Sequence, residues 1–265
     1  MPVDMAALAA DLAAESAVTR GLVDGLDEPG WRTPTPAAGW DIADQIGHLA
    51  YFDEVAVRSA VRPDEFRAEL AAAPESVNPD TIAARYRDRT GAQTLAWFDE
   101  ARAELLQAFK GLDPKVRLPW FGPPMSAASS LTARIMETWA HTQDIADALG
   151  VTRQPTGRLR HVAHIGVGAR AYSYAARGQA PPEVPVRVEL TAPDGTRWTW
   201  GPADAQDRVT GTALDFCLLV TQRRHRDDLD LTIEGPAAQE WMAIAQAFAG
   251  PPGPGRPARS GQSDE

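Results

Sequence analysis

Hydrophobic residues recur at helical spacing over most of the N-terminal part of the chain, and Pro- and Gly-rich breaks separate the periodic stretches. The predicted helices cover residues 4–26, 41–61, 80–111, 127–149 and 158–178. Asp41 and Ser126 are suitable N-caps, and Gly150 is a suitable helix stop. The helix over 80–111 is expected to kink near Gly91. The proline-bearing segment 60–78 is expected to be a loop with room for a short helix.

The pattern changes near residue 180, where alternation of apolar and polar residues replaces helical spacing. VPVRVELTAP and TRWTWG alternate on either side of a DG turn, which is typical of a β-hairpin. DRVTG and LDLTIEG are further predicted strands, and TALDFCLLVTQRR and PAAQEWMAIAQAF are predicted helices. The expected fold class is therefore mainly α. A helical bundle over residues 1–179 precedes a small α+β domain over 180–249 and a disordered Pro-, Gly- and Ser-rich tail over 250–265.

The composition is that of a soluble globular protein, with 44% hydrophobic and 23% charged residues among 265. A net charge of −10 argues against a nucleic-acid-binding surface. The short basic run 223–226 is a local exception to this acidic character. No apolar run approaches the roughly 20 residues of a membrane helix, and the acidic N-terminus lacks the features of a signal peptide. We expect a cytoplasmic monomer or homodimer whose partners are small molecules, with no nucleic acid and no membrane.

The chain has one cysteine, Cys217, and its neighbours in ALDFCLLV are apolar. A single thiol excludes an internal disulfide framework and an all-thiolate metal site. A buried structural thiol is expected at this position. Any sulfur chemistry would therefore need a thiol from another molecule.

The stretch METWAHTQDIADALG, residues 136–150, contains candidate metal ligands. Residues four apart lie on one face of a helix, so Glu137 and His141 can hold the same ion. Asp144 lies on the same side, where it could accept the free N–H of His141. His48, in the predicted helix 41–61, is the best candidate for a third ligand, and this donor set suits Zn²⁺ or another divalent first-row metal. An isolated E-x-x-x-H is more often a solvated surface pair, so spacing alone leaves both interpretations open.

Two segments resemble the mycothiol-dependent maleylpyruvate isomerase family, one of the DinB-like metal-binding bundles. The first, TPAAGWDIADQIGHLAYFD, carries Thr35–Pro36, Gly39–Trp40, Asp41 and His48–Leu49 in the family's order. The second carries Arg134, Glu137, His141 and Asp144. The resemblance covers roughly residues 5–150 with specific motifs and the remainder more loosely. The chain looks closer to an actinobacterial subgroup of metal-binding proteins than to the isomerase itself.

The resemblance implies a DinB-like four-helix bundle that holds a divalent metal, with Zn²⁺ as the first candidate, at His48, Glu137 and His141. It also implies mycothiol or another low-molecular-weight thiol as a co-substrate, with Trp40 and Arg134 as candidate cofactor-binding residues. A cation with an open coordination position stabilises a thiolate over the thiol, so the bound sulfur would be nucleophilic near neutral pH.

The resemblance further implies that an arginine after the second domain's helix, Arg223 or Arg224, holds a substrate carboxylate. The family's usual glycine before this arginine is Gln222 here. Asp144 is the remaining candidate for a catalytic role. The expected function is a metal- and thiol-dependent isomerase or S-transferase acting on small electrophiles.

Two other functions stay open. Asp44 or Gln45 could supply a fourth ligand and close the site, which would favour a non-catalytic metal-containing ligand-binding module. The metal could instead support hydrolysis of a thiol-conjugate amide, with Asp144 as the base. The second domain is also similar to small domains of enzymes that modify tRNA bases, although the acidic charge argues against RNA binding. His161 and His164 are expected to be core or solvated side chains.

Overall fold

The chain forms two compact units, Met1–Arg153 and Gln154–Glu265. The computed structural model describes residues 3–72, 79–253 and 255–259. Helices make up most of the first unit, and the four-stranded sheet belongs to the second, which confirms the expected mainly α fold with a small α+β part. Within the described residues, no helix is both long and apolar enough to cross a bilayer.

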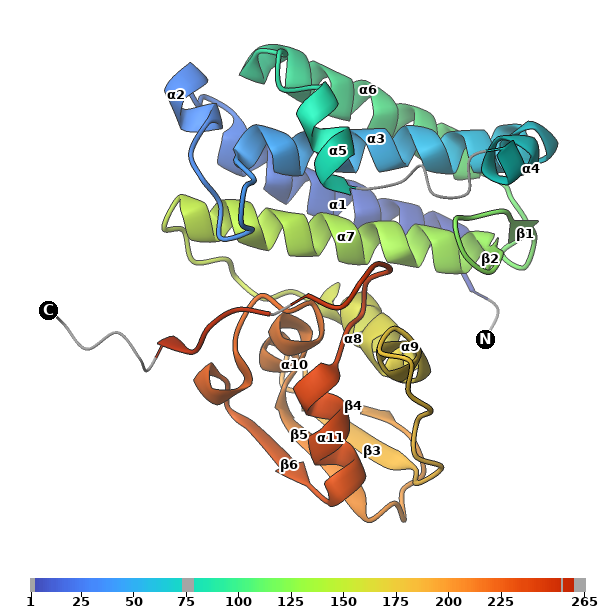
Figure 1. Ribbon diagram of the computed structural model, residues 1–265, viewed down its shortest axis with the longest axis vertical. Helices are drawn as coiled ribbons and strands as arrows, with labels where there is room; N and C mark the ends of the chain where they lie inside the picture. Colours follow the sequence, from blue (N-terminus) through green and yellow to red (C-terminus); the bar gives the residue numbers. More distant parts are fainter. Residues whose placement is uncertain (1–2, 73–78, 254, 260–265) are drawn as a thin grey trace, which may run out of the picture. The chain divides into compact units, whose positions relative to one another are not determined.

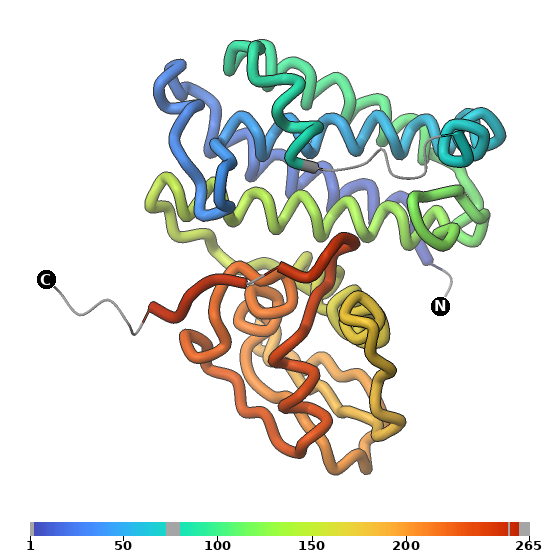
Figure 2. The backbone as a smooth tube through the Cα atoms, in the orientation of Figure 1, coloured from blue at the N-terminus to red at the C-terminus, as the bar shows by residue number. Residues whose placement is uncertain are grey.

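The N-terminal unit is a bundle of four long helices, α1, α3, α6 and α7, which run side by side in Figures 1 and 2. Its elements are α1 (Met5–Val23), α2 (Glu28–Trp31), α3 (Ile42–Val61), α4 (Pro63–Ala72), α5 (Pro79–Arg85), α6 (Gly91–Phe109), β1 (Arg117–Leu118), β2 (Met125–Ser126) and α7 (Ala127–Ala148). Helix α3 packs on both α6 and α7, while α1 packs on α7. Fully buried side chains such as Leu12, Ile46, Leu105 and Leu131 fill the space between them.

Local side-chain chemistry sets the ends of α3 and α7. Asp41 accepts the backbone N–H of Asp44, and the Asp44 carboxylate accepts that of Asp41, which forms a capping box at the start of α3. The hydroxyl of Ser126 accepts the backbone N–H of Ser129 and caps α7. Gly150 follows the end of α7 with a φ of 66°, a conformation that glycine adopts without strain. The predicted caps and the predicted stop are confirmed.

A buried ion-pair network joins α3, α6 and α7. Asp53, with 0% exposure, accepts from Nε of Arg102 at 2.6 Å and from Nε of Arg134 at 3.1 Å. Arg102 also donates to the hydroxyl of Thr138 on α7 at 3.0 Å. Because each arginine would be costly to bury without its partner, Asp53 fixes the relative position of the three helices.

The C-terminal unit places helices against a four-stranded sheet. Its elements are α8 (Leu159–Gly168), α9 (Arg170–Ala175), β3 (Val186–Thr191), β4 (Arg197–Trp200), β5 (Asp207–Thr212), α10 (Ala213–Val220), the 3₁₀ turn η1 (Arg226–Asp228), β6 (Leu231–Glu234) and α11 (Pro236–Ile244). The strand order is β4-β3-β5-β6, with β3 and β5 parallel and the other pairs antiparallel. The predicted hairpin, the two further strands and the two helices are confirmed.

Two predicted helices are each divided in the structure. The helix expected over 80–111 ends at Arg85, and α6 starts at Gly91, because the Thr90 hydroxyl accepts the backbone N–H of Gln93 and caps a new helix. The helix expected over 158–178 is divided into α8 and α9 at Ala169. The segment predicted as a loop contains α4, and residues 73–78 within it lie outside the described residues.

The division between the units falls after Arg153 and thus earlier than the expected boundary at 179/180. The cause is the packing of α8 on α10. Gly166 lets the two helices approach closely, since a Cβ at this position would lie 2.7 Å from Cγ2 of Val220. Of the tail predicted over 250–265, residue 254 and residues 260–265 lie outside the described residues.

Candidate metal centre

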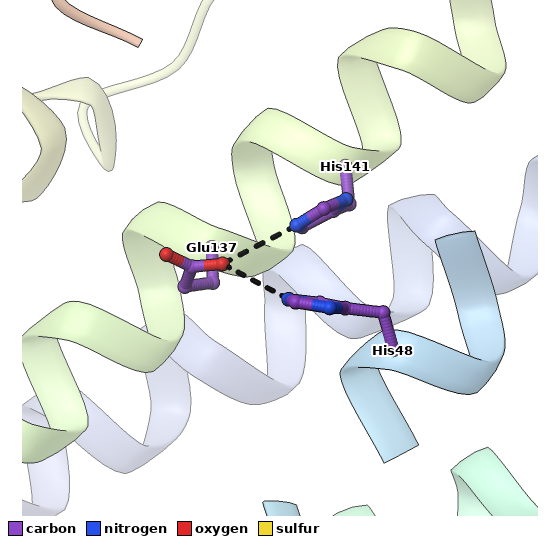
Figure 3. A group of neighbouring side chains, drawn as sticks. All are labelled: His48, Glu137 and His141. Atoms are coloured by element: carbon purple, nitrogen blue, oxygen red, sulfur yellow. Dashed lines mark hydrogen bonds and ion pairs between the residues drawn. The ribbon is translucent and has the colours of Figure 1, made fainter. Parts of the chain in front are cut away.

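Three potential ligands from two helices converge on one point in the N-terminal unit. His48 comes from α3, and Glu137 and His141 come from α7, as Figure 3 shows. Nε2 of His48 lies 3.4 Å from Oε2 of Glu137, and Nε2 of His141 lies 3.3 Å from the same oxygen. One ligand atom from each residue lies within 4.8 Å of the other two. The structure therefore brings together the three residues that were predicted from the sequence as metal ligands.

These distances match the geometry of a shared cation. Ligand atoms that each lie about 2.1 Å from a tetrahedral Zn²⁺ are separated from one another by about 3.4 Å. Both nitrogen–oxygen separations in the cluster, 3.3 and 3.4 Å, agree with this value. Two imidazole nitrogens and one carboxylate oxygen also form a donor set that suits zinc or a related divalent metal.

The electrostatics of the cluster favour the protonation states that bind metals. Burial, together with the neighbouring His141, lowers the pKa of His48 to about 4, so its imidazole is neutral at pH 7. Burial alone would raise the pKa of Glu137, but hydrogen bonds from His141 and His48 outweigh it and hold that pKa well below the usual value. A metal site needs neutral imidazole and ionised carboxylate ligands, and the pKa shifts of His48 and Glu137 are in these directions.

The cluster is only partly closed to solvent. The side chains of His48 and His141 are 10% and 11% exposed, and that of Glu137 is 19% exposed. Among the residues that the structure describes, no fourth His, Cys, Asp or Glu joins this group. A cation held by the three residues would thus keep at least one position for another molecule.

Asp44, the alternative fourth ligand, is committed elsewhere. Its carboxylate accepts from Nε and Nη2 of Arg87 at 3.0 and 2.8 Å, in addition to its role in the capping box of α3. Asp44 belongs to no candidate metal group among the described residues. The geometry therefore does not support a closed site with Asp44 as a ligand.

Gln45 orients His141, and this role was expected of Asp144. Nδ1 of His141 lies 2.5 Å from Oε1 of Gln45. Because an amide oxygen only accepts, Nδ1 donates to Gln45, which leaves Nε2 as the ring atom that faces the cluster. Gln45 in turn donates to the hydroxyl of Thr35 at 2.9 Å, which donates to the carbonyl of Trp40 at 2.9 Å. Asp144 is buried on α7 with 1% exposure and does not belong to the ligand group.

Aromatic rings border the cluster. The Trp40 ring is stacked at 6.0 Å from His141 and lies 5.4 Å from His48, and its indole N–H donates to Asp80 at 2.7 Å. The Phe52 ring lies 4.6 Å from His48 on the same helix. These rings limit the access of water to the ligands and provide an apolar wall for a molecule bound beside them. Trp40 thus borders the cluster, and its expected contact with a thiol cofactor stays a prediction.

Arg134 lies one helical turn before Glu137 on α7. Its Nε is bound to Asp53, and its Nη2 is buried with no hydrogen-bond partner among the described residues. Its expected contact with a thiol cofactor stays a prediction.

Arg223 and Arg224 lie in the C-terminal unit, after the end of α10. Arg224 lines a cavity of that unit, while Nη1 of Arg223 donates to the carbonyl of Thr221 at 2.6 Å. Their expected role at a substrate carboxylate also stays a prediction. Among the other histidines, His164 is exposed and His161 is half-buried.

Three residues that matter to the site were not foreseen in their structural roles: Gln45, Phe52 and Asp53. Helical spacing could have suggested Gln45 and Phe52, since they lie three residues before and four residues after His48. No such signal exists for Asp53, because only the packed bundle brings its two arginines from α6 and α7 together.

Two family models match the chain. One, described as the mycothiol maleylpyruvate isomerase N-terminal domain, matches residues 12–146. The other, described as wyosine base formation, matches residues 182–233. The first match contains all three clustered ligands, and the second covers much of the sheet of the C-terminal unit.

Full-length similarity extends to relatives and to solved structures. An uncharacterised protein of Mycobacterium tuberculosis, recorded in two strains, is 49% identical over 251 residues, which span 93% of this chain and 97% of the relative. The crystal structure of the mycothiol-dependent maleylpyruvate isomerase superposes with a TM-score of 0.59 at 16% identity, covering 89% of this chain and 96% of that one. A mutant of that isomerase gives 0.58 and 15% with the same coverage. At this identity the superpositions show a shared fold.

Proposed function

Because the chain belongs to the family of the mycothiol maleylpyruvate isomerase N-terminal domain, we propose that it is a divalent-metal- and thiol-dependent enzyme. The thiol is mycothiol or a related low-molecular-weight thiol. The reaction is isomerisation of, or S-transfer to, a small electrophile with an activated double bond. The observation that carries the proposal is the convergence of His48, Glu137 and His141 at separations that suit one cation.

The three ligands would hold the ion and leave a position for the thiol. A divalent cation at this point would supply the charge that stabilises a thiolate over a thiol near neutral pH. Zn²⁺ is the first candidate because two imidazoles and one carboxylate are a familiar catalytic donor set for it. Glu137 is the one negative group among these three ligands, so a divalent cation held by them would keep a net positive charge that stabilises a bound thiolate.

The protein's own sulfur is unsuitable as the nucleophile. Cys217 has 0% exposure, and burial raises the pKa of its thiol well above the usual value. It also lies in the other unit, where its Sγ contacts the carbonyl of Leu159. A thiol-dependent reaction would therefore use a diffusible thiol, in agreement with the family to which the chain belongs.

The residues around the cluster have separate roles in this proposal. Gln45 holds His141 in the tautomer that presents Nε2. Trp40 and Phe52 exclude water and hold the apolar part of a bound thiol or electrophile. Addition of the thiolate to a conjugated double bond makes a single bond about which the product can rotate, and loss of the thiolate then completes an isomerisation. Retention of the sulfur gives an S-conjugate.

The geometry favours this function over the two alternatives. A closed, structural site would need a fourth protein ligand, and Asp44 is held by Arg87 and the helix cap. An amidase with Asp144 as the base would need that carboxylate to reach a water molecule beside the cation. Asp144 is instead almost fully buried on α7.

A thiol-dependence assay tests the proposal. Purified metal-loaded protein is incubated with maleylpyruvate and with a panel of unsaturated acids and ketones, with and without mycothiol. We expect turnover that requires both thiol and metal, and loss of at least about a hundredfold in kcat/KM in His48→Ala. The exposed His164 provides the control variant, His164→Ala, which should keep full activity. Turnover that is unchanged without thiol, or in His48→Ala, would contradict the proposal.

A further inference from the structure

The aromatic border of the metal cluster continues away from the ligands as a run of contacting rings. The centroid of the Phe52 ring lies 4.6 Å from that of His48. The same centroid lies 6.4 Å from the ring of Trp120 and 6.2 Å from that of Phe121. Phe121 in turn lies 5.3 Å from Trp120 and 5.7 Å from Phe66. Since interacting aromatic pairs have centroids about 4.5–7 Å apart, these four rings form one aromatic patch that begins at the candidate ligand His48.

The aromatic patch combines one turn of α3 with two later segments of the chain. Phe52 follows His48 by four residues, so the two side chains lie on one face of this helix. Phe66 belongs to α4. Trp120 and Phe121 lie between the strands β1 and β2, beside α4 in Figure 1. Only the folded bundle brings these rings to the metal cluster.

Two features hold the segment between β1 and β2 against α3. The antiparallel pairing of the two strands closes the segment at its base. The hydroxyl of Ser59 on α3, which is 1% exposed, donates to the carbonyl of Pro119 at 2.6 Å. Because this carbonyl directly precedes Trp120, the bond fixes the segment to the helix that also carries His48 and Phe52. The fold therefore positions the rings of the segment relative to the metal cluster.

The aromatic patch is open to solvent at one end. Phe66 and Phe52 are buried, Trp120 is half-buried, and Phe121 is 38% exposed. A single exposed ring is common on protein surfaces and by itself indicates no site. Phe121 differs because its ring continues, through Phe52, to a metal cluster that is itself partly open. The patch thus offers apolar surface to a molecule that extends from the ligands toward solvent.

The rings of the patch carry no charge with which to hold a carboxylate. An arginine contacts the patch at Phe66, where Cζ of Arg58 lies 6.0 Å from the ring centroid. Nη1 of this arginine lies 3.4 Å from Oε2 of Glu69. The two charges sum to zero, so the pair adds little attraction for an anion. The patch therefore suits an uncharged, apolar group.

We propose that the substrate of the metal cluster is an electrophile with an aromatic or similarly bulky apolar group, which packs against Phe52, Trp120 and Phe121. This inference rests on the proposed thiol-dependent function and specifies its substrate class. In the reaction, the thiolate sulfur forms a bond to the β-carbon of the activated double bond, and the π electrons move toward the carbonyl oxygen. A proton from solvent then adds to the α-carbon and completes the S-conjugate. Contact with the patch holds the reacting carbon beside the cluster.

Binding of unreactive esters tests the proposal without turnover. Benzyl propionate and ethyl propionate lack the double bond and differ only in the apolar group. Their dissociation constants are measured by ligand-observed NMR titration of the full-length protein supplied with Zn²⁺. We expect benzyl propionate to bind at least about tenfold tighter, because it buries an additional ring. Equal binding of the two esters, or no detectable binding of benzyl propionate, would overturn the proposal.

Variants locate the binding at the patch. Phe121→Ala should weaken the binding of benzyl propionate at least about fivefold and that of ethyl propionate less than about twofold. Phe121→Tyr keeps the ring and should retain most of the affinity. Tyr172→Ala is the matched control, since Tyr172 is also 38% exposed but lies in the other unit. An equal loss in Tyr172→Ala, or no loss in Phe121→Ala, would refute a site at the patch.

Turnover of the matching acrylates separates this inference from the proposed function. Benzyl acrylate and ethyl acrylate carry the same reacting double bond, and their uncatalysed rates with mycothiol are subtracted. We expect kcat/KM to be at least about tenfold higher for benzyl acrylate, and Phe121→Ala should remove most of this advantage. Equal turnover of both would uphold the thiol-dependent function and refute the aromatic substrate class. Absence of turnover of both, with the binding preference for benzyl propionate intact, would count against the proposed function alone.

Discussion

Replacement of Gln45 by leucine tests how the fold prepares the metal cluster. The change removes the oxygen that accepts from Nδ1 of His141. The N–H is then left without this acceptor in a side chain where water has little access, because His141 is only 8% exposed. A buried donor without an acceptor costs about 1–3 kcal/mol. At 1.4 kcal/mol for each factor of ten, the expected loss of metal affinity is about 5- to 140-fold.

The assay is a competitive titration of Zn²⁺ between the protein and a fluorescent chelator at pH 7.5. Gln143→Leu is the matched control. Gln143 is also a buried residue of the bundle, but its side-chain amide donates to Asp147, which is not one of the three clustered ligands. Gln45→Glu keeps an acceptor for His141 and should retain most of the affinity. If Gln45→Leu binds zinc within about threefold of the parent, or loses no more than Gln143→Leu, Gln45 does not orient the ligand.

Three further predictions concern stability and reactivity. Asp53→Leu should lower the free energy of unfolding by about 3–5 kcal/mol in urea titrations, because it leaves Arg102 and Arg134 buried without their partner; a loss below about 1 kcal/mol would contradict the network. Asp41→Ala should cost about 1 kcal/mol in the same measurement through loss of the α3 cap, and an unchanged denaturation midpoint would refute it. Burial raises the pKa of Cys217, so its thiol stays protonated at pH 8 and should react with a disulfide reagent only in denaturant; rapid reaction of the native protein would be inconsistent with this.

The helices of the site could be predicted because their ends depend on nearby residues. Asp41 and Ser126 cap α3 and α7 through backbone groups three residues away, so the sequence alone contains the necessary information. The break before α6 has the same kind of signal, in which Thr90 is followed by Gln93. The expected kink near Gly91 lies at this break, but apolar spacing continues across it, so periodicity alone predicts one helix where the Thr90 cap starts a second.

The boundary between the units could not be found from local patterns. Helix α8 has an apolar face, as the bundle helices do. The sequence of such a face does not determine which surface the helix packs against. Gly166, which allows the close contact of α8 with Val220 of α10, is an ordinary small residue in the sequence. The change from helical to strand spacing near residue 180 therefore marked the start of the sheet and not the start of the unit.

The metal ligands were predictable to different degrees. Glu137 and His141 follow from spacing on one helix. His48 lies 89 residues before Glu137, so its place in a predicted helix makes it only a candidate, which the family resemblance then supports. The orientation of His141 was not predictable, because Asp144 is a plausible neighbour on its own helix and Gln45 approaches from α3. Only the packing of the two helices decides which acceptor reaches Nδ1.

The most direct test of the account is the metal content of the purified full-length protein and of His48→Ala, measured by mass spectrometry after dialysis against metal-free buffer. His164→Ala, which removes an exposed imidazole outside the cluster, serves as the control. We predict about one divalent metal per chain in the parent and in the control, and less than about a tenth of this in His48→Ala. Equal metal content in His48→Ala and the parent, or a parent that binds no divalent metal even when supplied with it, would contradict the assignment of the centre.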